Sequence, residues 1–475
     1  MLPPPSPGDR QRVTAANRPG SKPEGAAPGW KVGLALVSLA LSLLLWLNGL
    51  IDSLSRPSVG SDLNRRQLEL TVLAEPNLKG ALRPLLSDGN PLQTLQKALE
   101  EERNRAAEDG TAIDPDLNLE LALVLLRQNQ PEQARPLLKA LAQGQGPNAA
   151  LAERLLGGSS SESIPPQTAA NSLLRLWSCE ALAPGGGDRC GATALSRRAT
   201  WQLLAVSAAP VVLLVLGSAA LLRELWLRWR GRAAEAPPLL GPALGGVDAV
   251  LLIAGGFVVV GELLTPLLVA PLLTALLQGL AITSPLREGV TVVGLYLALM
   301  TGPLVILALL LRGQGAAALQ FRWAPGTRSL RSALKGFLMV LPLVSLVGWL
   351  QGQLWGDAGG SNPLLELVLN SHNVPALACF GFTAIVLAPL FEETIFRGAL
   401  LPVAARRLGP LGGVLLSALI FAVAHLSLGE LLPLLVLGIG LGWLRWSGGR
   451  LGSCVLMHAL WNALTFTNLV LLGWS

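Results

Sequence analysis

The pattern of apolar and polar positions divides the chain into three parts. A polar tail at residues 1–29 precedes an apolar run from Val32 to Ile51, a polar segment continues to about residue 200, and long apolar runs fill the rest. About 20 consecutive apolar residues are enough to cross a bilayer as a helix. The pattern therefore predicts an all-α protein: a polytopic transmembrane helix bundle with a small helical domain inserted after the first span.

The apolar runs predict about nine spans. The first, at residues 30–52, indicates an uncleaved N-terminal anchor, because no convincing small-x-small cleavage site follows it. Eight more are expected near residues 201–223, 247–275, 289–311, 331–351, 375–398, 411–427, 431–446 and 451–472. Residues 201–246 then hold the second span with a basic loop, and residues 247–475 form a membrane core.

The positions of lysine and arginine predict the orientation, because basic residues collect in cytoplasmic loops. The Pro- and Gly-rich tail 1–29, which we expect to be disordered, carries Arg10, Arg12, Arg18 and Lys22. The loops at 223–232, 312–335, 397–407 and 445–450 are also basic, whereas the short loops of the other side contain one basic residue, Arg287. We therefore expect a cytoplasmic tail and an extracytoplasmic domain at residues 53–200.

The segment 53–200 has apolar residues at helical spacing. In residues 117–143 a turn around Gln128–Pro131 separates two amphipathic stretches. This resembles one tetratricopeptide helix pair, but no second copy recurs at a fixed period, so a small helical domain of another kind stays open. Cys179 and Cys190 flank a glycine-rich turn, and an extracytoplasmic compartment would allow a disulfide between them.

Composition supports a membrane protein. Hydrophobic residues make up 51% of the chain and charged residues only 14%, with a mean hydropathy of +0.51. The net charge of +6 is explained by the basic loops, and no compact basic run with interleaved aromatic residues appears. The lipid bilayer is therefore an expected partner and nucleic acid is not.

Three polar spots interrupt the apolar background of the last four spans. They are FEETIFRG (391–398), FAVAH (421–425) and HALWN (458–462). Charged groups at bilayer depth cost at least about 2.5 kcal/mol each and indicate a functional site. Counting along the helices from the turn near 409–413 places Glu392 and His425 at about the same depth, and His458 shares a helix face with Asn462.

The spacing within the first spot predicts separate roles for its charges. Glu392 and Glu393 point about 100° apart on a helix, so both cannot face one small site. Glu393 and Arg397 are four residues apart, which suits a supporting ion pair and leaves Glu392 free to face a cavity.

The four remaining groups could carry out hydrolysis. Glu392 and His425 together can hold and deprotonate a water molecule, while His458 and Asn462 can donate hydrogen bonds to a developing oxyanion. Alternatively, Glu392, His425 and His458 could hold a divalent metal such as zinc. Their positions on three helices do not reproduce the H-E-x-x-H pattern of soluble zinc proteases.

The order Glu392-Glu393-x-x-x-Arg397, Phe421-x-x-x-His425 and His458-x-x-x-Asn462 resembles the motifs of the CAAX-processing and bacteriocin-processing (CPBP) intramembrane proteases, which include the type II CAAX prenyl endopeptidases. The resemblance covers roughly residues 247–475. It implies an intramembrane endopeptidase, of metallo- or glutamate type, that hydrolyses membrane-associated protein or peptide substrates. It also implies that Glu392 and His425 activate water, with His458 and Asn462 at the oxyanion and the other motif residues in support.

Other interpretations stay open. The chain could be a non-catalytic family member that acts as a scaffold, immunity or assembly factor through residues 53–200, or a transporter with a proton-relay glutamate. The polar spots could be a snorkelling ion cluster and interhelical hydrogen bonds. Glu262 could serve helix packing or line the same cavity, and His372 is expected at the surface.

Overall fold

The computed structural model describes a helical molecule. It covers residues 27–56, 59–78, 89–108, 110, 112–157, 172–182, 189–232, 235–323, 326–355 and 360–474, and these residues contain no β-strand. The tail predicted to be disordered, residues 1–29, lies outside the described residues except for its last three. Helix α2 begins at Gly29, directly after Pro28, and ends at Ser53.

A domain of short helices follows α2 along the chain. Its elements are α3 (Val59–Ala74), η1 (Glu75–Asn77), α5 (Pro91–Glu108), α6 (Pro115–Arg127), α7 (Pro131–Ala142), α8 (Pro147–Gly157), α9 (Ser172–Leu182) and α10 (Ala192–Leu203). Asp114 caps α6, because its side chain accepts a hydrogen bond from the backbone N–H of Asp116. The predicted turn is present, since α6 ends at Arg127 and α7 begins at Pro131.

The core of this domain contains buried charges. Arg65 Nη1 lies 3.0 Å from Glu69 Oε1 and 3.3 Å from Glu120 Oε2, and both carboxylates are 1% exposed. Burial raises the pKa of Glu120 well above its usual value, and the neighbouring Glu69 carboxylate raises it further. The packing of α3 against α6 is therefore coupled to pH.

Eight helical stretches are long and apolar enough to cross a membrane: Gly29–Ser53, Ala192–Trp229, Gly246–Gly279, Leu286–Leu310, Gly326–Trp355, Val374–Val423, Leu431–Gly448 and Leu451–Gly473. Gly409, with φ 72°, breaks the stretch Val374–Val423. Its two halves lie against each other, because Ser417 Oγ donates a hydrogen bond to the carbonyl of Phe396 at 3.0 Å. With this break, the prediction of an all-α bundle with about nine spans is confirmed.

Several spans are built from more than one helical segment. The second comprises α10, η2 (Leu204–Ala208) and α11 (Ala209–Trp229), and the third comprises α12 (Gly246–Val250), η3 (Leu251–Leu264) and α13 (Thr265–Gly279). Helices α14 (Leu286–Leu310) and α15 (Gly326–Trp355) flank η4 (Ala316–Leu319). The broken stretch comprises α17 (Val374–Phe382), η5 (Thr383–Leu387), α18 (Ala388–Glu393), η6 (Thr394–Leu400) and α19 (Leu401–Val423), and α20 (Leu431–Gly448) and α21 (Leu451–Gly473) follow.

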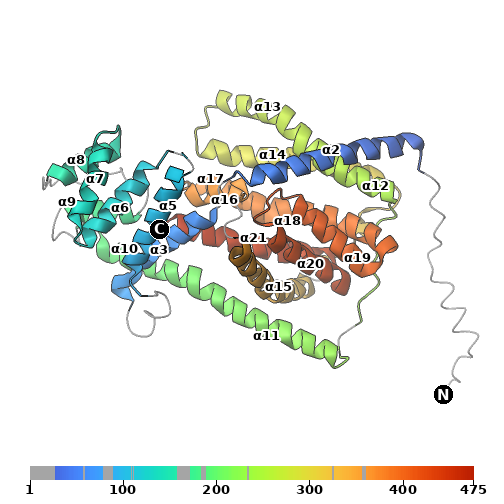
Figure 1. The fold of residues 1–475 in the computed structure, drawn as a ribbon. Helices are drawn as coiled ribbons and strands as arrows, with labels where there is room; N and C mark the ends of the chain where they lie inside the picture. Colours follow the sequence, from blue (N-terminus) through green and yellow to red (C-terminus); the bar gives the residue numbers. More distant parts are fainter. Residues whose placement is uncertain are drawn as a thin grey trace, which may run out of the picture.

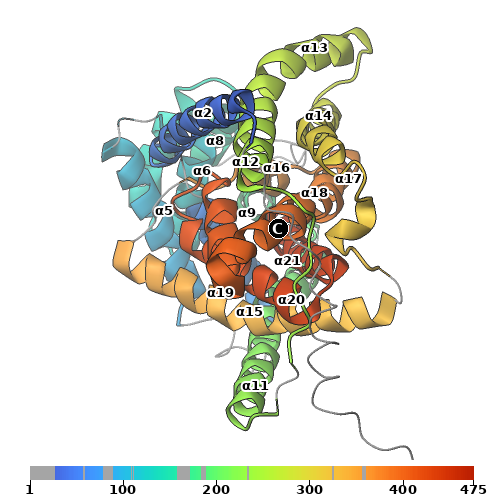
Figure 2. The same ribbon diagram turned by 90° about the vertical axis from the view of Figure 1, so that its right-hand side faces the viewer.

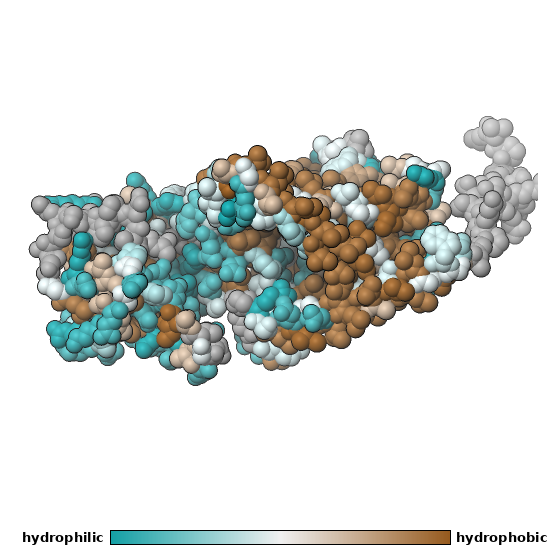
Figure 3. Space-filling view, turned by 90° about the horizontal axis from the view of Figure 1, so that it is seen from above, coloured by the Kyte–Doolittle hydropathy of each residue, from teal (hydrophilic) through white to brown (hydrophobic). Residues whose placement is uncertain are grey.

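The helical domain lies at one end of the bundle. Helices α3 and α5–α10 gather at the left of Figure 1, whereas α12 and the turn within α19 lie at the opposite end, where α2 begins. Seen along the bundle, α21 lies among α15, α18, α19 and α20, and α13 bends away from the other spans (Figure 2). On the face shown in Figure 3, apolar residues gather over the bundle and polar residues over the domain.

A short helix, α16 (Pro363–Asn370), lies between the domain and the bundle. The sequence interpretation treated this segment as an exterior loop, and the structure corrects it: Asn362 caps the helix by accepting a hydrogen bond from the backbone N–H of Leu364. Arg66 on α3 donates a hydrogen bond to Asn370 Oδ1 at 2.9 Å. One continuous hydrophobic core joins the domain, α16 and the domain-side ends of α17 and α21.

Candidate active site

The EExxxR motif lies on α18 and the π-helical segment η6, and its inner charges are paired. Arg397 Nη1 lies 2.9 Å from Glu393 Oε1, and both side chains are fully buried. Arg397 Nη2 also donates a hydrogen bond to the carbonyl of Gly438 on α20 at 3.1 Å. A Cβ at Gly438 would lie 3.0 Å from Ala418 Cα, so the absence of a side chain lets α20 approach α19 closely. The buried arginine thereby ties the motif helix to its neighbour.

A second buried arginine, Arg445, supports the same helix from the other side. Its Nε donates a hydrogen bond to the carbonyl of Arg397 at 3.3 Å, and its Nη2 donates one to the carbonyl of Leu240 at 2.8 Å. Sequence reasoning used Arg445 only as a loop charge that orients the chain. In the structure it satisfies a backbone carbonyl of the π-helical segment, where regular i to i+4 hydrogen bonds are interrupted.

His458 on α21 lies between the two glutamates. Its Nδ1 is 3.0 Å from Glu393 Oε1, and its Nε2 is 4.0 Å from Glu392 Oε2. The second distance is too long for a direct hydrogen bond, but a water molecule about 2.8 Å from each atom would fit it. Glu393 therefore contacts Arg397, as the spacing indicated, and also orients His458, which the spacing did not indicate.

Glu392 is held by a residue that sequence reasoning missed. Tyr296 on α14 donates a hydrogen bond from its hydroxyl to Glu392 Oε1 at 3.0 Å. Glu392 Oε2 is buried and has no hydrogen-bond partner within the described part of the chain. One signal was available in the sequence: this is the single tyrosine of the protein, and it lies in an otherwise apolar span.

His425 lies in the turn directly after α19. Its Nδ1 is 2.7 Å from the carbonyl of Phe421. A carbonyl only accepts hydrogen bonds, so Nδ1 carries the proton and, in the neutral ring, Nε2 is an acceptor. The Phe421 ring is fully buried, with its centroid 4.6 Å from that of His425 and 4.3 Å from the guanidinium carbon of Arg397. Phe421 thus packs between two polar groups of the motif.

Asn462 lies one turn after His458 on α21. Its Nδ2 donates a hydrogen bond to the carbonyl of Ala384 at 2.7 Å, within the π-helical segment η5. An amide nitrogen carries two hydrogens, so a second one can still be donated to another acceptor. The contact fixes the direction of the side chain and links α21 to the start of the motif helix.

These side chains face one cavity of about 540 Å³. Glu392, Tyr296, His425, His458 and Asn462 all line it, and apolar residues of α16, α20 and α21 complete its walls. The cavity size lies within the range of small-molecule and peptide side-chain sites. The structure therefore places in one cavity the four groups that the sequence distributed over three separate motifs.

Glu430 was also missed as a residue of this cavity. It lies between α19 and α20, and its carboxylate accepts a hydrogen bond from the backbone N–H of Asn362 at 3.4 Å. Burial raises its pKa, although the hydrogen bond from Asn362 and the nearby His425 and Arg56 oppose the shift. Its position adds a second carboxyl group, besides that of Glu392, at the domain side of the cavity.

Two other polar residues lie outside this cavity. Trp46 on α2 donates a hydrogen bond from its indole nitrogen to Glu262 Oε2 at 3.1 Å. The alternative in which Glu262 lines the same cavity is therefore wrong, and the residue instead joins α2 to η3. His372 is exposed and lines an open hollow on the outer side of α16.

Three side chains of this cavity, Glu392, His425 and His458, are of the types that can hold a divalent metal. No group of three or more His, Cys, Asp or Glu side chains within the described residues is placed to hold a metal ion. His458 uses Nδ1 toward Glu393 and His425 uses Nδ1 toward Phe421, which leaves the Nε2 atom of each ring for another contact. Metal dependence, with Glu392, His425 and His458 as ligands, stays a prediction.

Cys179 and Cys190 form a disulfide, separated by 11 positions in the sequence. It connects the end region of α9 with the segment before α10. The other two cysteines, Cys379 and Cys454, are free.

Comparison with known families assigns two parts of the chain. Residues 374–464 match the family model of the Rce1-like type II CAAX prenyl endopeptidases. This segment contains every motif residue discussed above, from Glu392 to Asn462. Residues 60–201 match a family model described as a domain of unknown function (DUF8675). No curated protein and no solved structure gave a match to the chain.

Proposed function

We propose that this integral membrane protein is an intramembrane endopeptidase whose active site is the cavity around Glu392. The proposal rests first on its C-terminal helices, which are related to the type II CAAX prenyl endopeptidases and so to the CPBP family. The observation that carries the proposal is the convergence of Glu392, His425, His458 and Asn462 on that cavity. Its substrates would be membrane-associated proteins or peptides.

In the proposed reaction, Glu392 acts as the general base. A water molecule donates one hydrogen to Glu392 Oε2, which has no hydrogen-bond partner among the described residues, and the other to Nε2 of His425. As the water oxygen forms a bond to the carbonyl carbon, one proton passes to Glu392 and the carbonyl electrons move onto oxygen. Glu392 then gives this proton to the leaving nitrogen, the C–N bond breaks, and a carboxylic acid and an amine are formed.

The oxyanion would be stabilised by His458 and Asn462. Asn462 can use the amide hydrogen that does not bind Ala384. His458 donates from Nε2 only in its charged form, with the Nδ1 proton held by Glu393. A buried hydrogen-bond donor of this kind typically contributes about 2.7–4 kcal/mol to such a transition state.

The test compares peptide ends in native membranes that contain wild type, Glu392→Gln or Glu262→Gln. The glutamine at 392 keeps the shape and cannot accept the proton, so we expect wild-type-dependent ends to disappear. Glu262→Gln is the matched control, because Glu262 is half-buried among the spans, like Glu392, but contacts Trp46 outside the cavity. Identical ends in wild type and Glu392→Gln would overturn the protease proposal and favour the scaffold alternative. A parallel chelator arm tests metal dependence.

We propose further that the domain at 53–200 recruits or restricts substrates, by holding α16 at the edge of the cavity. Leu364, Leu365, Leu367 and Val368 of α16 line the cavity. On its other side α16 receives the hydrogen bond from Arg66. Substrate would then enter from the domain side, which the predicted topology makes extracytoplasmic.

This role is tested by Arg66→Ala, with Arg135→Ala as the control. Arg135 belongs to the same domain but is 62% exposed and contacts only Glu132 among the ion pairs of the described residues. We expect Arg66→Ala to change which substrates are cleaved, or how fast, while Arg135→Ala has no effect. Unchanged processing in Arg66→Ala would contradict the proposed role of the domain and leave the protease proposal intact.

A further inference from the structure

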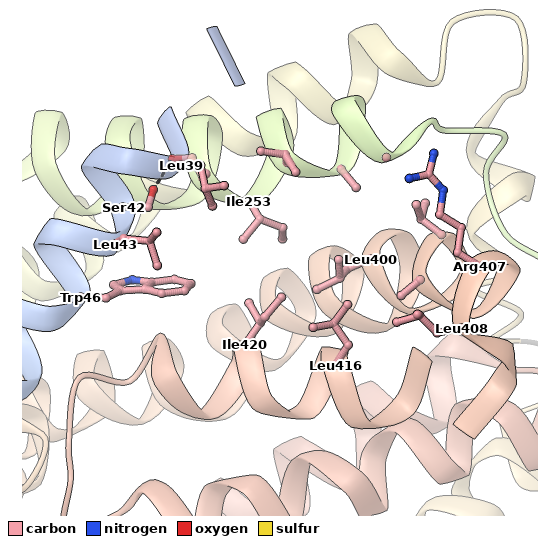
Figure 4. A pocket seen from close by; sticks show the side chains of 16 residues that line it. Leu39, Ser42, Leu43, Trp46, Ile253, Leu400, Arg407, Leu408, Leu416 and Ile420 are labelled. Atoms are coloured by element: carbon pink, nitrogen blue, oxygen red, sulfur yellow. Dashed lines mark hydrogen bonds between the residues drawn. The ribbon is translucent and has the colours of Figure 1, made fainter. Parts of the chain in front are cut away.

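A second cavity, of about 300 Å³, lies between the N-terminal anchor and the hairpin that carries the glutamates (Figure 4). Its walls come from α2, from α12 with η3, and from η6 with α19. Leu43, Ile253, Leu400 and Ile420 line it, and Arg407 is the charged residue among the lining residues. This groove shares no lining residue with the catalytic cavity.

The groove lies along the part of α2 that is bonded to η3. Along the α2–η3 face, Ser42 Oγ donates a hydrogen bond to the carbonyl of Ala254 at 3.1 Å, and Trp46 bonds to Glu262. A Cβ at Gly255 would lie 3.3 Å from Ser38 Oγ, so this glycine permits the close approach. On the side of α19, α2 is bonded at its end, where Ser53 Oγ accepts a hydrogen bond from the backbone N–H of Leu428 at 3.2 Å, whereas the gap lies farther along α2, between Leu39 and Trp46.

The groove opens sideways to the bilayer. At its edge Leu39, Leu43 and Leu408 are 41%, 58% and 58% exposed, respectively. An apolar gap of this kind does not hold water, since water needs two or more polar partners. It must therefore be filled by an apolar group that reaches it from the membrane.

The dimensions favour a hydrocarbon chain over a helix. The lining residues of α2 run from Leu39 to Trp46, about 10 Å at 1.5 Å per residue. An α-helix with side chains is about 10–12 Å wide, as much as the whole length of the groove, so a slimmer chain fits it better.

The charge at one end selects the kind of lipid. Arg407 lies at the end of the groove in Figure 4, beside the first turn of α12: a Cβ at Gly246 would lie 2.7 Å from Arg407 Nη1. Lys31, at the same end of the bundle, is paired with Asp248 at 3.0 Å, so this pair adds no net charge there. Basic groups between transmembrane helices at the membrane surface bind anionic lipid head groups, and a guanidinium matches phosphate geometry.

We propose that this groove binds an anionic phospholipid, with one acyl chain along Leu43, Ile253 and Ile420 and the phosphate at Arg407. The bound chain packs against Leu400 and Val403, which share a hydrophobic cluster with Phe391 and Phe396 of the motif helix. The lipid therefore supports the back of the helix that carries Glu392. This binding is independent of whether the protein is a protease.

The test is native mass spectrometry of protein released from nanodiscs made of equal parts phosphatidylglycerol and phosphatidylcholine. We expect the wild type to retain phosphatidylglycerol about fivefold over phosphatidylcholine, the preference that one basic residue supplies. Arg407→Gln should lose this preference, Arg407→Lys should keep most of it, and Ala404→Phe, which fills the groove, should reduce retention of both lipids.

Arg312→Gln is the matched control, because Arg312 is an exposed basic residue just after α14 and does not line the groove. We expect it to retain lipid like the wild type. The proposal would be overturned if Arg407→Gln and Ala404→Phe both retained as much lipid as the wild type, with the same preference for phosphatidylglycerol. Equal retention of the two lipids by the wild type, or recovery of a peptide in place of lipid, would also overturn it.

Discussion

The hydrogen bond from Tyr296 to Glu392 leads to a quantitative prediction. The substitution Tyr296→Phe removes one hydroxyl group and keeps the ring, which packs edge-to-face against Phe391 with centroids 6.2 Å apart. The lost hydrogen bond, 3.0 Å long, runs from a neutral donor to a carboxylate. Hydrogen bonds to charged groups contribute about 1.5–3 kcal/mol. If this bond holds Glu392 in its productive position, the rate should fall roughly 10- to 150-fold.

The assay follows how fast wild-type-dependent peptide ends accumulate in membranes with matched protein levels. We expect the turnover rate to fall while the thermal unfolding temperature in detergent changes little, because ring packing is preserved. Thr383→Val is the control: Thr383 also lines the cavity, but its hydroxyl bonds to the carbonyl of Cys379 and not to Glu392. A rate for Tyr296→Phe within twofold of the wild type would refute a positioning role for the tyrosine.

Three further predictions concern stability. Glu393→Gln leaves Arg397 buried without its counter-charge and should destabilise the bundle by about 3–5 kcal/mol. The measurement is the unfolding temperature, which should fall in Glu393→Gln and recover when Arg397→Met is added to the same chain. Burial first, and then the neighbouring Glu69 carboxylate, raises the pKa of Glu120 above its ordinary value of 4.5. The stability contributed by the protonated Glu120 is therefore complete below pH 4.5 and is lost as the pH rises through the raised pKa. Hydrogen exchange of α6, corrected for intrinsic rates, should therefore show less protection at pH 8 than at pH 5. Glu120→Gln should reduce the difference, and the neighbouring Glu69, whose pKa is also raised, accounts for part of what is left. Replacing Cys179 and Cys190 by serine removes a disulfide that spans 11 positions and should lower the free energy of unfolding of the domain by about 3 kcal/mol. We expect faster proteolysis of the domain, and equal rates of proteolysis would contradict the prediction.

The sequence by itself determined the spans and the polar residues of the site. Apolar runs are local features, so α2, α14, α15 and α21 could be predicted from length and hydropathy alone. The cost of placing charge in a bilayer made Glu392 conspicuous among its apolar neighbours. Spacing along one helix also indicated the contact of Glu393 with Arg397, which are 2.9 Å apart in the structure. Each of these inferences needs only residues that are close in the chain.

Only the tertiary structure decided which groups meet across helices. His458 reaches Glu393, Tyr296 reaches Glu392, and Trp46 reaches Glu262 over 216 positions of sequence. Such contacts depend on the rotation and depth of each helix, which are set by close packing at many small residues. A helical period shows which residues share a face, but not which neighbour that face meets. For the same reason, the groove beside α2 could not be foreseen, because a gap between helices exists only once all three of its walls are in place.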